Sequence, residues 1–87
     1  MNLIHHKGLS AERWFRMSLM EQLANVGTDV ERIIRWRTTN GEQSTKAFER
    51  ALELLDLTVA DPKNKGHRRK ELLRIREALV DYFMYDN

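Results

Sequence analysis

Cysteine is absent from this chain of 87 residues, proline occurs once and glycine four times. Without cysteine the protein can form no disulfide bond and no thiolate metal site, and it has no thiol nucleophile. No apolar run approaches the roughly 18 residues that a membrane-spanning helix needs. The first ten residues, MNLIHHKGLS, lack the apolar stretch of a secretory signal peptide. We therefore expect a cytoplasmic protein, in a setting where disulfides are rare.

The residues that are present suit a small globular domain. Hydrophobic residues make up 41% of the chain and charged residues 32%, which is typical of a helical bundle and unlike a disordered chain. The formal net charge of +2 is lower than is usual for a protein that depends on phosphate contacts. We predict one domain over residues 9–87 after a flexible tail at 1–8. A core this small is marginal, so we expect association with a second copy or with another protein.

Apolar residues recur at helical spacing in three segments. The first helix is predicted to begin after Ser10, a favourable N-cap residue, and to continue to about Arg37 because no proline interrupts it. An Asn40-Gly41 turn with positive φ separates it from a second helix over residues 43–60, which ends before Pro62. Residues 67–85 form the third helix. Short connections predict an all-α, up-down-up antiparallel bundle of three helices with a long first helix.

The unequal helix lengths carry a further prediction. A first helix of about 28 residues would span about 42 Å, and the other two, at about 18 residues, would span about 27 Å. The first helix must therefore project beyond the bundle or kink near Gly27. We also expect Gly27 to mark a close crossing of two helices, since this residue has no side chain. A projecting end would expose apolar surface, which favours a homo-oligomer, most simply a two-fold dimer.

Aromatic residues provide the candidate interface, which comprises Trp14, Phe15, Trp36, Tyr82 and Tyr85. Trp14 is predicted to lie exposed beside the projecting end, where a tryptophan could anchor a contact between proteins. Single exposed aromatic residues also occur without such a role. Trp36 and the two tyrosines are predicted to gather with Phe83 at the opposite end, either as a cap on the core or as a surface for another protein.

A basic segment connects the second and third predicted helices. From residue 61 to residue 76 the sequence is DPKNKGHRRKELLRIR. In an up-down-up bundle this segment lies at the same end as the start of the first helix. The candidate anion or nucleic-acid site therefore comprises Arg13, Arg16, Lys63, Lys65, Arg68, Arg69 and Lys70. The N–H groups that begin the third helix would favour a phosphate there. The alternative is a solvated loop compensated by Asp61, Glu71 or Glu12, since the segment lacks interleaved aromatic residues that stack on bases.

Patterns typical of catalysis or metal binding are missing. The sequence contains no phosphate-binding loop, dinucleotide glycine pattern or nucleophile elbow. The three histidines, two of them adjacent in the tail, are unsuitably spaced for a closed metal site. Glu49, Glu53 and Asp56 share a helix face that we interpret as solvated. Arg76 lies within an apolar face, where we expect either that its stem packs on apolar surface while its charge reaches solvent or that it forms an ion pair, with Asp56, Glu53 and Asp29 as the candidate partners. We expect no enzyme activity, no cofactor and no metal.

Most of the chain after residue 8 falls in three stretches: WFRMSLMEQLANVGTDVERIIRW (14–36), KAFERALELLDLT (46–58) and ELLRIREALVDYF (71–83). These stretches resemble a group of small, uncharacterised prokaryotic helical-bundle proteins. The resemblance implies a helical fold and carries no activity, catalytic residue or cofactor. The sequence thus favours a non-catalytic module for protein–protein interaction that self-associates through its first helix. Nucleic-acid or anion binding through residues 63–76 is the alternative, and an accessory subunit of an enzyme is a third hypothesis.

Overall fold

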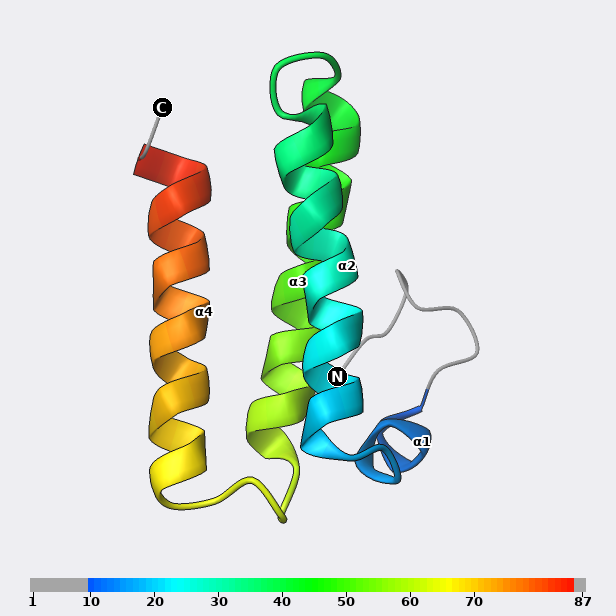
Figure 1. Cartoon of the computed structure of the whole chain (residues 1–87), viewed down its shortest axis with the longest axis vertical. Coiled ribbons are helices and arrows are strands. Elements are labelled where there is room, and N and C mark those ends of the chain that lie inside the picture. The colour runs from blue at the N-terminus through cyan, green and yellow to red at the C-terminus, as the bar shows by residue number, and fades with distance from the viewer. Residues whose placement is uncertain (1–9, 86–87) are drawn as a thin grey trace.

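The structure, a computed structural model, describes residues 10–85, which form four α-helices (Figure 1). The helices are α1 (Ala11–Phe15), α2 (Leu19–Trp36), α3 (Gly41–Ala60) and α4 (His67–Tyr85). In Figure 1 the chain runs upward through α2, downward through α3 and upward again through α4. The described residues contain no strand, so the prediction of an all-α fold is confirmed. The tail predicted over residues 1–8 lies outside this part of the chain.

The long first helix predicted from the sequence is wrong, because the chain leaves the helix after α1. The N–H groups of Arg16 and Met17 bond to carbonyls three residues earlier, at 3.2 and 3.1 Å, and close a tight last turn. Ser18 then begins α2. Its hydroxyl accepts a hydrogen bond from the N–H of Glu21 at 3.1 Å, and the Glu21 carboxylate accepts one from the N–H of Ser18 at 2.9 Å. This reciprocal capping box stabilises a new helix start.

Gly27 neither kinks α2 nor marks a helix crossing, so both predictions for this residue are wrong. The helix passes through it without interruption over 18 residues. A Cβ atom placed on Gly27 would meet nothing within 4 Å outside its own stretch of helix. With 20 residues in α3 and 19 in α4, the three long helices have similar lengths, and the projecting end that we expected is absent.

The main core lies between α2 and α3, which pack together along their lengths. Ala47 and Ala51 of α3 and Ile33 of α2 are fully buried in this core, and small side chains such as alanine let two helices approach closely. The start of α3 is fixed by Asn40, whose side chain accepts a hydrogen bond from the N–H of Gln43 at 3.1 Å. Asn40 therefore acts as an N-cap, and the expected turn with positive φ does not form, since Gly66 is the only described residue with positive φ.

Helix α4 is held against α3 through one narrow face. Leu72 and Leu79 are the only buried residues of α4. Phe83 stacks on Phe48 of α3, with ring centroids 4.1 Å apart and ring planes 6° apart. Arg76 Nε donates a hydrogen bond to Asp56 Oδ1 at 2.7 Å, so that of the two alternatives expected for Arg76 the ion pair is the one that forms. These few contacts leave much of the apolar surface of α4 exposed.

We expect Gly27→Ala to raise the free energy of unfolding by about 1 kcal/mol, because alanine is the better residue in an open helix interior. Gly66 provides the matched control, since its φ of 69° is left-handed. Gly66→Ala should lower the free energy of unfolding by about 1 kcal/mol. Urea unfolding followed by circular dichroism measures both changes. A Gly27→Ala variant less stable than the wild type would contradict the open surroundings of this residue.

Candidate functional site

The cations predicted to form an anion site surround one end of the molecule. Lys63, on the connector between α3 and α4, donates a hydrogen bond from Nζ to the carbonyl of Phe15 at the end of α1, at 3.0 Å. In Figure 1 this connector forms the lower end of the fold, with α1 on the same end. Arg13 and Arg16 therefore lie at the same end as the connector and the first turn of α4. We call this region the basic end.

The basic end contains cations that hold the fold together and cations that form no ion pair within the described part of the chain. Lys63 forms an ion pair with the buried carboxylate of Asp61, and Arg69 Nε donates a hydrogen bond to the carbonyl of Val59 at 3.1 Å. Four exposed cations form no ion pair with any residue from 10 to 85, namely Arg16, Lys65, Arg68 and Lys70. The first turn of α4 contains no acidic residue. Its positive side chains therefore adjoin the positive end of the helix dipole, an arrangement that an anion would stabilise.

A buried polar cluster lies beneath the basic end. It comprises Trp14, Gln22, Thr58, Asp61 and Asn64, each at most 2% exposed, and we call it the polar hub. The indole N–H of Trp14 donates a hydrogen bond to Thr58 Oγ1 at 3.0 Å. Gln22 Nε2 donates to the Trp14 carbonyl at 2.9 Å and to Asp61 Oδ2 at 2.8 Å. These bonds join α1, α2 and the end of α3 where unpaired polar groups would be costly.

Asn64 closes the polar hub from the connector. Its Nδ2 donates hydrogen bonds to Gln22 Oε1 at 3.0 Å and to the carbonyl of Thr58 at 3.1 Å. Asp61 Oδ1 accepts a hydrogen bond from the N–H of Lys63 at 3.0 Å, which forms an Asx turn. Sequence reasoning missed the hub. Two signals were available, namely the polar Gln22 on the apolar side of its helix and the turn-forming run from residue 61 to residue 64.

Trp14 is 1% exposed, so the prediction that it lies exposed on a projecting helix is wrong. The break after α1 directs its indole against α3, where Thr58 accepts the N–H. Phe15 is half-buried and packs against the core. Contact between a second copy and Trp14 would therefore require α1 to unpack.

The other predicted interface residues lie near the opposite end. The Tyr82 ring lies 4.3 Å from the guanidinium carbon of Arg37, and this cation–π contact joins α4 to the end of α2. Tyr82 also packs against the core, as Phe83 does, while Trp36 is half-buried. Tyr85 is 75% exposed. Of the five predicted interface residues, Tyr85 is thus the one most accessible to another molecule.

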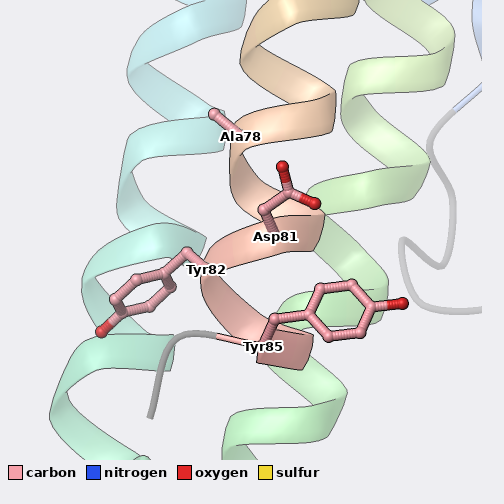
Figure 2. A pocket seen from close by; sticks show the side chains of 4 residues that line it. All are labelled: Ala78, Asp81, Tyr82 and Tyr85. Atoms are coloured by element: carbon pink, nitrogen blue, oxygen red, sulfur yellow. The ribbon is translucent and has the colours of Figure 1, made fainter.

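Helix α4 exposes more large apolar side chains than any other described helix. Leu73, Ile75, Met84 and Tyr85 are between 42% and 75% exposed, whereas α2 exposes two such residues. A shallow pocket on α4 is lined by Ala78, Asp81, Tyr82 and Tyr85 (Figure 2), and we call it the α4 pocket. Exposed apolar surface of this kind is typical of sites that contact other proteins.

Metal sites, membrane spans and known relatives provide no further guide to function. No group of three His, Asp or Glu side chains within residues 10–85 is placed to hold a metal ion. Within the same range no helix has the length and apolarity needed to cross a membrane. The chain matches no protein-family model, no curated protein and no solved structure. Function is therefore inferred from the chemistry of the surfaces themselves.

The surroundings of Asp61 shift the pKa of its carboxyl group in opposing directions. Burial raises its pKa, but hydrogen bonds from Lys63 and Gln22 and the charge of Lys63 lower the pKa more, to a net value below the usual 3.8. A carboxyl with a lower pKa in the folded state stabilises the fold above its unfolded pKa. This contribution is lost as the pH falls through the folded pKa.

We therefore expect Asp61→Asn to lower the free energy of unfolding by about 2 kcal/mol at pH 7, because charge-assisted hydrogen bonds are lost. The difference between wild type and variant should shrink as the pH falls from 4 to 2. Urea unfolding at pH 7, 5, 3 and 2 measures it. Glu12→Gln, at an exposed carboxylate of α1, is the control and should leave stability at pH 7 nearly unchanged. An Asp61→Asn difference independent of pH would contradict the role of the charged carboxylate.

Proposed function

We propose that this protein is a non-catalytic helical module that self-associates, and that α4 supplies the contact surface. The observation that supports the proposal is that α4 buries two residues, Leu72 and Leu79, whereas four of its large apolar side chains are exposed. Burial of apolar surface contributes a favourable free energy of roughly 25 cal/mol for each Å² removed from water. A second copy that covers α4 would therefore add to the small core that a chain of 87 residues can form.

The roles of the carboxyl groups with altered pKa values support a structural rather than a catalytic protein. Hydrogen bonding to Ser18, chiefly to its backbone N–H, lowers the pKa of Glu21, and the bond from that N–H to the Glu21 carboxylate is part of the capping box of α2. The pKa of Asp61 is lowered within the polar hub. Groups with altered pKa values often mark active sites, but both of these carboxyl groups serve the fold.

We expect the mass measured by light scattering to rise with protein concentration toward twice the monomer mass. The rise should persist in high salt, because screening weakens charge contacts and not apolar ones. Ile75→Lys combined with Tyr85→Lys should weaken association by at least about tenfold, as expected when large anchors of an interface are lost. Met20→Lys is the matched control, since Met20 is 82% exposed on α2, and it should leave the mass unchanged. A monomer at every concentration would overturn the proposal.

The second candidate function is binding of nucleic acid or another polyanion at the basic end. The observation that favours it is the set of four exposed cations that form no ion pair with any described residue. Three of them, Lys65, Arg68 and Lys70, lie on the connector or the first turn of α4. The positive end of the α4 dipole adds to their attraction for phosphate.

For this second function we expect binding of a mixed-sequence single-stranded RNA that weakens steeply as salt increases. Arg68→Ala with Lys70→Ala should weaken binding and reduce the slope of log affinity against log salt by about 1 to 2, since each lost phosphate contact releases fewer counterions. Lys46→Ala, an exposed cation on α3, is the control and should have little effect. Fluorescence anisotropy measures these affinities, and an affinity unaffected by salt would rule this function out.

A further inference from the structure

The α4 pocket has the geometry of a site for a helix. Its four lining residues, Ala78, Asp81, Tyr82 and Tyr85, are spaced i, i+3, i+4 and i+7. In Figure 2 the rings of Tyr82 and Tyr85 point to opposite sides of the helix, and Ala78 contributes only a methyl group. Four residues at this spacing form the hole that receives one side chain of a facing helix in knobs-into-holes packing. The pocket therefore fits a second helix.

The charges along α4 indicate which helix is complementary. The surface of residues 67–75 carries Arg68, Lys70, Glu71 and Arg74, and that of residues 77–85 carries Glu77 and Asp81. The first half of the exposed surface is thus net positive and the second half net negative. A second copy of α4 that runs antiparallel places opposite charges together, whereas a parallel copy aligns like charges. The surface is therefore complementary to itself in the antiparallel direction.

The register follows from the small residue and its neighbours. Ala78 lets two helix backbones approach closely, which places the crossing point there. Ile75 precedes Ala78 by three residues and Tyr82 follows it by four, so antiparallel pairing brings Ile75 to the pocket of the second copy. Ile75 is 42% exposed and is available for insertion. The same register brings Arg74, four residues before Ala78, close to Asp81 of the second copy.

We propose that α4 pairs antiparallel with α4 of a second copy about a two-fold axis at Ala78. Ile75 of each copy enters the α4 pocket of the other, and Arg74 lies beside Asp81 of the second copy. The inference rests on the proposed self-association and adds its surface, direction and register. Because the same patch serves both copies, the contact closes as a dimer.

An introduced cysteine tests the register directly, because the chain has no cysteine of its own. Ala78→Cys places two thiols across the two-fold axis, and a disulfide forms only where the two Cα atoms lie within about 7 Å. After mild oxidation at a concentration where the wild type is dimeric, most of this variant should run as a covalent dimer on a non-reducing gel. Leu73→Cys is the matched control, since Leu73 is exposed on another flank of α4, and it should remain monomeric on the gel.

The outcomes separate the inference from the proposed function. A wild-type dimer in light scattering with cross-linking at Leu73→Cys and not at Ala78→Cys overturns the pairing at the α4 pocket and keeps self-association. A monomeric wild type overturns both.

A charge exchange tests the antiparallel direction. Arg74→Asp and Asp81→Arg should each weaken dimerisation about three- to tenfold, and the combined variant should recover most of the loss. The two positions are seven residues and about 10 Å apart along one helix, so recovery cannot arise within a single copy. Circular dichroism confirms that each variant is folded. A combined variant no tighter than the weaker single variant overturns the antiparallel register.

Discussion

The side chain of Gln22 joins three parts of the chain that are far apart in sequence. Its amide nitrogen donates to the Trp14 carbonyl and to Asp61, and its oxygen accepts from Asn64. The buried Gln22 amide needs these three partners, because a buried polar group without a hydrogen bond typically destabilises a protein by about 1–3 kcal/mol. The cost rises to several kcal/mol where the surroundings are fully apolar. The polar hub therefore selects one arrangement of α1, the start of α2 and the connector, and the positions of both candidate surfaces depend on it.

Helix α4 shows this dependence most clearly. The hub fixes the connector from which α4 begins, and Arg69 ties its first turn to the carbonyl of Val59. Farther along, the Arg76–Asp56 ion pair and the stack of Phe83 on Phe48 hold the helix against α3. These contacts use one narrow face. The remaining surface of α4 is accessible to other molecules. It includes the basic end at the N-terminus of the helix and the α4 pocket near its C-terminus.

Local patterns predicted α3 and α4 to within two residues of their observed bounds, because turn residues, proline and helical periodicity act over short distances. The break between α1 and α2 was not predicted. It depends on the capping box of Ser18 and on the bond between Trp14 and Thr58, 44 residues apart, and periodicity carries no information about such a distant contact. The gathering of cations at one end followed from topology. The exposed apolar surface was assigned to the first helix, because periodicity does not reveal which apolar face its neighbours cover.

The sparse attachment of α4 also bears on the order in which the protein folds. Helices α2 and α3 are adjacent in sequence and pack along their lengths, so their hairpin can form early from local contacts. We expect α4 to dock last and to open at the lowest free energy of the three long helices. A second copy that buries α4 would then stabilise the part of the fold with least stability of its own. Docking of this helix and assembly of the dimer would become one equilibrium, in which protein concentration sets how well ordered each copy is.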